Sequence, residues 1–153
     1  MDSGSPDFIP RDSRWKARLR DSFARQAFMK LIGAELAHVA PGAVDIAMPY
    51  RPELTQQHGY LHAGTTSSIA DSAAGFAALS LMSPGRGVLT TEFKINLLSP
   101  ANGVRLVARG RVVKPGRTLT VCRSDVSGIG EDGTETAVAT GLFTMMAVQG
   151  LED

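Results

Sequence analysis

The chain has 153 residues, of which 43% are hydrophobic and 20% are charged, and its formal net charge is +1. This length suits one domain with its own core, and the composition is that of an ordinary globular protein. Neither the net charge nor any basic stripe gives a reason to expect a nucleic-acid partner. No run approaches the roughly 18 apolar residues of a membrane span, and the first residues lack the apolar centre of a signal peptide.

A single cysteine, Cys122, excludes an intramolecular disulfide and fits a reducing compartment. It lies in the alternating stretch "TLTVCRSDV", so we interpret it as a strand residue and not as a nucleophile. From these features we expect a cytoplasmic protein without a membrane partner.

The first third of the chain predicts a tail, a helix and two strands. Residues 1–12 are rich in Gly, Ser, Asp and Pro and predict a flexible tail, followed by a single domain over residues 13–150. Apolar side chains recur at helical spacing from Ser13 to about Ile32, and Gly33 is placed to end that helix. The next stretch, "AELAHVAPGAVDIAMPY", predicts two strands joined at its Pro-Gly pair.

Residues 64–82 are the one long candidate for a buried helix, and every later segment alternates. The alternating segments are "VLTTEFKINLL", "VRLVARGRVV", "LTVCRSDVSG" and "TAVATGLFTMMAV". We expect four strands in a meander, because turn signals separate them at regular spacing. The order predicts an α+β domain in which a curved antiparallel sheet wraps around a helix of small residues. Such a half-barrel leaves exposed strand edges, so association is expected.

The predicted long helix carries a lone carboxylate, Asp71, among small and apolar residues. An ionised carboxylate there is costly unless it is paired or solvated, so we expect its pKa to be raised. Helical spacing sets Ser67 and Ser68 on the face of Asp71, and Ile69 and Phe76 on the opposite side. Two interpretations stay open: a structural Asp held by a serine or a partner chain, or a base or nucleophile in a cleft.

The start of this helix is a second candidate site. If the helix begins near Gly64, the amides of Ala63, Gly64 and Thr65 have no partner within the helix. They lie at the positive end of the helix dipole, which suits a developing oxyanion. His62 either marks this entrance or is a hydrogen-bonded core histidine.

The spacing of His58 and His62 also raises the possibility of a metal pair. Gly59 makes a continuous helix between them unfavourable, and no HExxH pattern or cysteine cluster is present. We therefore predict no metal site. Dinucleotide and phosphate-binding glycine motifs are missing as well, so we expect no cofactor.

The stretch "LTQQHGYLHAGTTSSIADSAAG" resembles the signature of the hotdog-fold acyl-CoA thioesterases, in particular the PaaI-type (phenylacetate-pathway-like) branch. That signature is an amide residue, a His-Gly-Gly six residues on, and an Asp nine residues after the His. The segments "EFKINLLSPA" and "GRVVKPGRTLTVCRSDV" look like the strands that follow in the family. The likeness covers about residues 25–148 and implies the hotdog fold, here with an additional N-terminal helix.

The resemblance implies roles for particular residues. Asp71 would be the catalytic carboxylate, either attacking the thioester carbonyl or activating a water. Ala63 stands at the first Gly of His-Gly-Gly, whose backbone amide polarises that carbonyl, and His62 would help to shape the site. Gln56 stands where the family often has Asn and would orient the water or the carbonyl. Thr90 aligns with a hydroxyl that supports the attacking water.

The resemblance also implies contacts to substrate and an oligomer. Gly64 at the helix start and Lys114 and Arg117 around the "KPGR" turn would bind substrate, the last two near the CoA phosphates. In the family the site spans two subunits, so a homodimer or a dimer of dimers is implied. CoA is part of the substrate and not a cofactor.

The function we expect is hydrolysis of an aryl- or medium-chain acyl-CoA to the free acid and CoA. Two alternatives stay open on the same fold: a non-catalytic acyl-CoA binding or sensing module, and an enoyl-thioester hydratase or dehydratase. The substitutions Ala63 for Gly and Gln56 for Asn leave room for the first of these.

Overall fold

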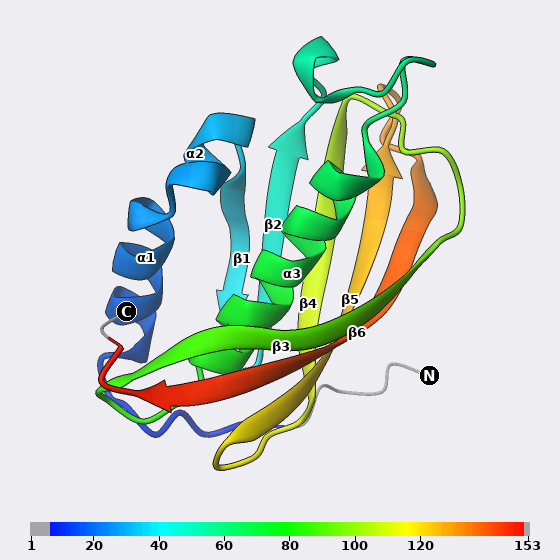
Figure 1. Ribbon diagram of the computed structural model, residues 1–153. Helices are drawn as coiled ribbons and strands as arrows, with labels where there is room; N and C mark the ends of the chain where they lie inside the picture. The colour runs from blue at the N-terminus through cyan, green and yellow to red at the C-terminus, as the bar shows by residue number, and fades with distance from the viewer. Residues whose placement is uncertain (1–6, 152–153) are drawn as a thin grey trace.

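The computed structural model describes residues 7–151. One curved antiparallel sheet wraps around the long helix α3, and the short helices α1 and α2 stand beside β1 at one edge (Figure 1). The helices are α1 (Trp15–Arg25), α2 (Ala27–Ile32), the 3-10 turn η1 (Pro52–Leu54) and α3 (Ala63–Leu79). The strands are β1 (Glu35–Ala40), β2 (Ala43–Pro49), β3 (Arg86–Leu97), β4 (Arg105–Lys114), β5 (Leu119–Ile129) and β6 (Glu135–Gln149). None of the helices in the described part of the chain is long and apolar enough to cross a membrane.

The strand order in the six-stranded sheet is β1-β2-β4-β5-β6-β3. The α+β class and the curved sheet around a central helix are thus confirmed, but the prediction of a four-strand meander is wrong. Of the four strands predicted to form it, only β4, β5 and β6 are neighbours in sequence order, while β3 pairs with β6 at the far edge. The place beside β4 is taken by β2, with Val44 opposite Gly110. Alternation of side chains predicts strands, but it carries no information about which strand is the partner.

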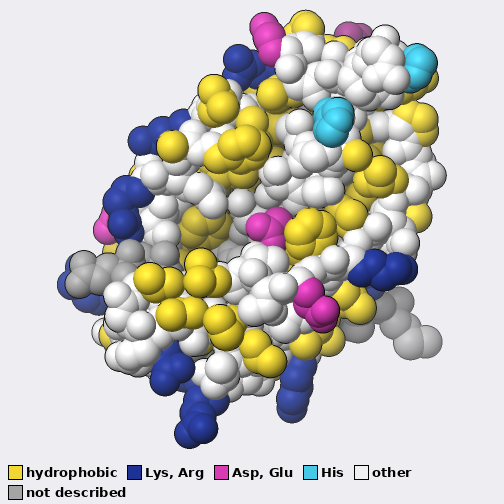
Figure 2. Space-filling view, in the orientation of Figure 1, with side chains coloured by type: hydrophobic (Ala, Val, Ile, Leu, Met, Phe, Trp, Pro, Cys, Tyr) yellow, Lys and Arg dark blue, Asp and Glu magenta, His cyan; other side chains and the backbone are white. Residues whose placement is uncertain are grey.

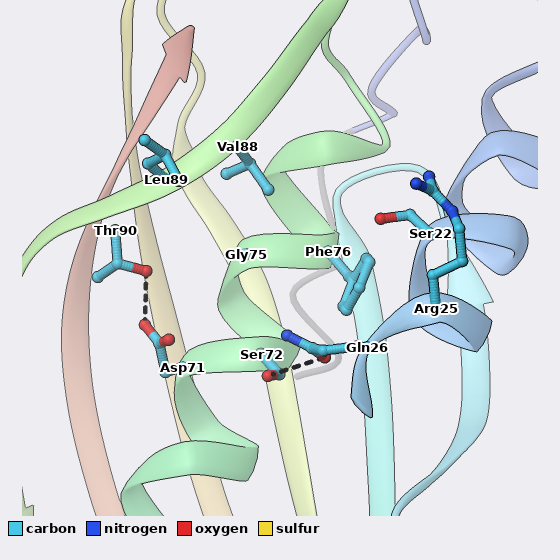
Figure 3. Close-up of a pocket in the computed structure, with 10 residues that line it drawn as sticks. All are labelled: Ser22, Arg25, Gln26, Asp71, Ser72, Gly75, Phe76, Val88, Leu89 and Thr90. Atoms are coloured by element: carbon cyan, nitrogen blue, oxygen red, sulfur yellow. Dashed lines mark hydrogen bonds between the residues drawn. The ribbon is translucent and has the colours of Figure 1, made fainter. Parts of the chain in front are cut away.

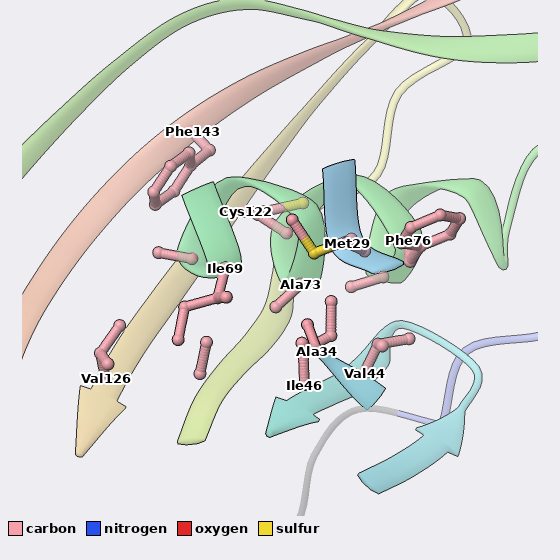
Figure 4. Close-up of a cluster of buried hydrophobic side chains, with 14 of the residues drawn as sticks. Met29, Ala34, Val44, Ile46, Ile69, Ala73, Phe76, Cys122, Val126 and Phe143 are labelled. Atoms are coloured by element: carbon pink, nitrogen blue, oxygen red, sulfur yellow. The ribbon is translucent and has the colours of Figure 1, made fainter. Parts of the chain in front are cut away.

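The core lies between α3 and the concave face of the sheet (Figure 4). Small side chains let the helix backbone come very close to β4. At Gly110 a Cβ atom would lie 2.2 Å from the carbonyl oxygen of Ala73 and 2.7 Å from the amide nitrogen of Ala74. Larger side chains such as Ile69 and Phe143, both fully buried, complete the core around this contact. Glycine on the strand and alanine on the helix therefore set the distance between the two layers.

The helix predicted from Ser13 to Ile32 is divided into two. Gln26 separates α1 from α2 with an extended backbone (φ −74°, ψ 95°). The break reorients the chain so that Leu19 on α1 and Met29 on α2 are both buried in the core. Gly33 ends α2 as predicted, in the left-handed conformation (φ 72°) that favours glycine.

Helix α1 is fastened to the C-terminal end of α3 by Arg18. Its guanidinium donates hydrogen bonds to the carbonyl oxygens of Leu79 (3.3 Å), Met82 (2.9 Å) and Ser83 (3.0 Å). It also pairs with the carboxylate of Asp12 at 3.3 Å. The arginine thus supplies partners to carbonyl groups that a helix end leaves unpaired.

The flexible tail expected over residues 1–12 is described only in part, because residues 1–6 lie outside the described residues. Residues 7–12 contact the domain: Phe8 packs against the core beside Gly42, and Asp12 is buried against Arg18. Composition alone did not indicate these two anchors, since Gly, Ser and Pro dominate the segment.

We expect Gly110→Ala to destabilise the fold, because the new methyl group would collide with the backbone of α3. The free energy of unfolding should fall by about 1–3 kcal/mol, as in other overpacked cores. Denaturant unfolding measures this. Gly75→Ala on α3 is the matched control, because its added Cβ meets nothing within 4 Å and helix propensity favours alanine. A Gly110→Ala protein as stable as the wild type would contradict the close contact.

Candidate active site

A cleft of about 350 Å³ lies between α3, the N-terminal helices and β3. Asp71, Gly75 and Phe76 from α3 form one wall, while Val88 and Thr90 from β3 form another (Figure 3). In the space-filling view a hollow opens near the middle of this face, bordered by an acidic and several hydrophobic side chains (Figure 2). The cleft is the one that contains the predicted catalytic carboxylate.

Asp71 is half-buried, and its carboxylate is hydrogen-bonded to Thr90. The Thr90 hydroxyl donates a hydrogen bond to Oδ1 of Asp71 at 2.8 Å (Figure 3). The two residues are far apart in sequence and meet because β3 runs along α3 at the open edge of the sheet. A hydroxyl that holds one carboxylate oxygen leaves the other oxygen free to act in the cleft.

The interpretation of Asp71 as a carboxylate held by a neighbouring serine is wrong. The hydroxyls of Ser67 and Ser68 donate instead to the carbonyl oxygens of Ala63 and Gly64, at 2.8 and 2.7 Å. Serine on a helix often bonds to the carbonyl four residues earlier, which removes it from contact with other side chains.

Phe76, expected on the side opposite Asp71, lines the same cleft. Phe76 faces α1, where Phe23 packs edge-on against it with ring centroids 5.5 Å apart. The N-terminal helices thereby extend the cleft around the flank of α3.

Burial raises the pKa of Asp71 above its ordinary value, and the hydrogen bond from Thr90 partly opposes this rise. Burial disfavours the charged carboxylate, whereas a hydroxyl donor favours it. The two effects together give a carboxylate that binds a proton more readily than a solvated one while staying hydrogen-bonded. That property suits a group that must take up a proton or attack a carbonyl.

The start of α3 borders a second pocket, of about 610 Å³. Gln56, His62 and Ala63 all line it, so the structure brings these three predicted residues together. The side-chain oxygen of Gln56 accepts a hydrogen bond from the backbone N–H of His58, which fixes the connector turn. The amide end of Gln56 therefore belongs to an ordered turn beside the helix start.

His62 is the N-cap of α3. Its Nδ1 accepts a hydrogen bond from the N–H of Gly64 at 2.8 Å, and its carbonyl oxygen accepts from Thr65 at 3.0 Å. The side chain is exposed, so the interpretation as a core histidine is wrong. Of the three amides expected to be unpaired, only that of Ala63 has no partner within residues 7–151.

Alanine fits at position 63 without backbone strain. Ala63 is the first residue of α3, and no residue other than glycine has a positive φ in the described part of the chain. The amide therefore keeps the geometry that a glycine would give it at this position.

The structure separates the two halves of the predicted site within one chain. Ala63 and Asp71 are eight residues apart on one helix, so about 12 Å separates them along its axis. One carbonyl group cannot contact both. Lys114 and Arg117 lie in neither pocket: they flank the β4–β5 turn, at the opposite end of the molecule from η1 (Figure 1).

The N-terminal helices contribute to the cleft, which the sequence pattern did not indicate. Arg25, Gln26 and Ser22 line it, whereas the pattern of residues 13–32 predicted only one continuous helix. Within residues 7–151 no cluster of three or more His, Cys, Asp or Glu side chains is suited to bind a metal ion.

Comparison with known proteins identifies the family. Residues 58–132 match the thioesterase superfamily. The chain is 31% identical over 102 residues to human acyl-coenzyme A thioesterase 13, covering 65% of this chain and 72% of the relative. It is 30% identical over 92 residues to an esterase-like protein of Saccharolobus solfataricus, covering 60% of this chain and 65% of the relative, just under two thirds of its length.

Solved structures agree with this assignment. A thioesterase family protein from Silicibacter pomeroyi is 51% identical with a TM-score of 0.87, covering 89% of this chain and 99% of that one. The PaaI protein of the Escherichia coli phenylacetic acid degradation operon shares the fold at 19% identity and a TM-score of 0.78, covering 90% and 95%. The chain therefore belongs to the thioesterase superfamily and has the hotdog fold. The hotdog fold, the PaaI-like resemblance and the enzyme class are thus confirmed.

The raised pKa of Asp71 predicts a pH-dependent stability difference for Asp71→Asn. Below the ordinary value of 3.8 the carboxyl is protonated whether the chain is folded or unfolded, so it contributes no pH dependence. As pH rises through the raised folded pKa, the wild type loses stability because the buried group ionises. Asp71→Asn avoids that loss.

Denaturant unfolding between pH 4 and pH 8 should therefore show Asp71→Asn gaining stability over the wild type as pH rises. Thr90→Val removes the hydroxyl that opposes the shift, so its stability should fall more steeply with pH than that of the wild type. A constant difference across the range would contradict the raised pKa.

Proposed function

We propose that the protein is an acyl-CoA thioesterase that releases a free acid and CoA, with Asp71 as nucleophile or general base. The observation that carries this proposal is the Asp71 carboxylate, half-buried in a cleft and held by Thr90 at 2.8 Å, in a chain of the thioesterase superfamily. The acyl group is aryl or of medium length. The proposal includes a cytoplasmic location and no cofactor, because CoA enters as part of the substrate.

Two chemical routes fit this carboxylate. Asp71 can attack the thioester carbonyl, expel the CoA thiolate and form an anhydride that water then hydrolyses. Alternatively, Asp71 takes a proton from a water molecule as that water attacks the carbonyl. In both routes negative charge develops on the carbonyl oxygen, and the free N–H of Ala63 at the positive end of α3 stabilises it.

The separation of Ala63 from Asp71 supports a site built from two chains. We infer a homodimer in which Ala63 and Gln56 of one copy face Asp71 and Thr90 of the other, as the hotdog resemblance implies. The edge strand β3 supports this arrangement, since Leu89, Phe93 and Leu97 on it are 49%, 49% and 55% exposed. Hydrophobic side chains gather over β3 and β6 along the lower front of the molecule (Figure 2). Pairs of such dimers would form a tetramer.

The remaining residues have supporting roles in this proposal. His62 fixes the first turn of α3 by accepting from Gly64, and so positions the Ala63 amide. Gln56 orients the carbonyl or the attacking water. Lys114 and Arg117 are exposed cations that bind the CoA phosphates across the assembled oligomer.

Asp71→Asn should lower kcat by about 100- to 10,000-fold, because the amide neither accepts a proton nor attacks. Thiol release from a panel of aryl- and aliphatic acyl-CoAs measures this, and circular dichroism reports the fold. Asp21→Asn, an exposed carboxylate on α1, is the control for the change in charge. Unchanged turnover in Asp71→Asn would exclude the proposed role, and acyl-CoA binding without thiol release by the wild type would favour a non-catalytic module.

A mixed-dimer experiment tests the two-chain site. Ala63→Pro deletes the N–H but suits the first position of a helix, and the extended backbone of His62 (ψ 141°) tolerates a following proline. Each single variant should be inactive. Co-expression of Ala63→Pro with Asp71→Asn should restore about a quarter of wild-type activity, because half of the dimers are mixed and each holds one intact site.

The control Ala63→Ser keeps the amide and should stay active. If the mixed population is as inactive as the single variants, Ala63 and Asp71 do not act from different chains.

A further inference from the structure

The wall of the cleft that faces Asp71 is polar, which hydrolysis of a simple hydrocarbon acyl group does not require. Gln26, at the break between α1 and α2, directs its side chain toward α3 (Figure 3). Its carbonyl oxygen accepts a hydrogen bond from the Ser72 hydroxyl at 3.5 Å. The amide nitrogen makes no hydrogen bond to any residue in 7–151 and is available to a ligand.

Arg25 adds a positive charge to this wall. It is exposed at the last turn of α1 and lines the cleft. Ion pairs in the described residues involve other arginines, and none includes Arg25. In Figure 3 its guanidinium lies on the opposite side of the cleft from the carboxylate of Asp71.

The middle of the cleft is apolar. Gly75, Phe76 and Val88 lie between the two charged groups (Figure 3). Asp71 to Gly75 is one turn of α3, or about 6 Å along the axis, so this apolar stretch suits a methylene chain of medium length. An ionised Asp71 would repel an anionic group of a ligand, and Arg25 would attract it. An anionic group would therefore bind at the Arg25 end of the cleft.

Resting on the proposed function, we propose that the acyl group carries a terminal carboxylate. The substrate would be the monothioester of a medium-length dicarboxylic acid. Its thioester carbonyl lies at Asp71, its methylene chain lies against Phe76 and Val88, and its free carboxylate is bound by Arg25.

Three acyl-CoAs of equal chain length test this: adipoyl-CoA, 6-hydroxyhexanoyl-CoA and hexanoyl-CoA. They end in a carboxylate, a neutral polar group and a methyl group. The wild type should favour adipoyl-CoA in kcat/KM over both others. Arg25→Gln should lower the adipoyl-to-hexanoyl ratio about tenfold. The loss should lie mainly in KM, because the carboxylate is bound equally before and during reaction.

Arg20→Gln is the matched control, since Arg20 is an exposed arginine on α1 that does not line the cleft. It should leave the ratio unchanged. Added salt should lower the ratio in the wild type more than in Arg25→Gln, because the contact is between charges near the surface. A wild type that prefers hexanoyl-CoA, or an equal fall in the ratio for both arginine variants, would overturn the inference while leaving the thioesterase proposal intact. Thiol release from none of the three would overturn both.

Discussion

The contact between α3 and β4 is the constraint on which the rest of the structure depends. Gly110 lets the backbone of Ala73 approach so closely that a Cβ atom would lie 2.2 Å from its carbonyl oxygen. The sheet can then curve around the helix, and most helix side chains must be small. The side of α3 away from β4 is left for the larger and polar groups, and Asp71 lies there under the edge strand β3. The position of the carboxylate is thus a consequence of how closely the two layers pack.

Much of this architecture could be read from the sequence, because periodicity and turn residues act locally. The long helix, the stop at Gly33 and the strands on either side of Pro41 and Gly42 all follow from such local patterns. The pairing of strands does not follow from local patterns, because the alternation in β3 is the same whether it pairs with β4 or β6. The broken helix at Gln26 was missed for a related reason, since the apolar positions keep a helical spacing across the break.

In the candidate site, too, some features could be predicted from local sequence and others depend on packing. Asp71 became a candidate because a carboxylate in an apolar helix is costly, whereas its hydrogen bond to Thr90 depends on how β3 packs along α3. The wall formed by Phe76 and Arg25 depends on where α1 packs. The positions of side chains around α3 alone do not predict the place of α1. The distance between Ala63 and Asp71, however, follows from helix rise alone. Because this distance is too long for one carbonyl group to contact both residues, it favours a site that includes a second chain.

The attachment of α1 by Arg18 has a consequence for selectivity. Three carbonyl groups and one carboxylate hold this guanidinium, so the helix that bears Arg25 cannot swing outward without leaving a buried charge unpaired. The cleft consequently has a fixed wall on the side of α1. The fixed wall would then limit the length of the acyl group. An acyl group that is one carbon too long would have to bend, because the wall could not move outward.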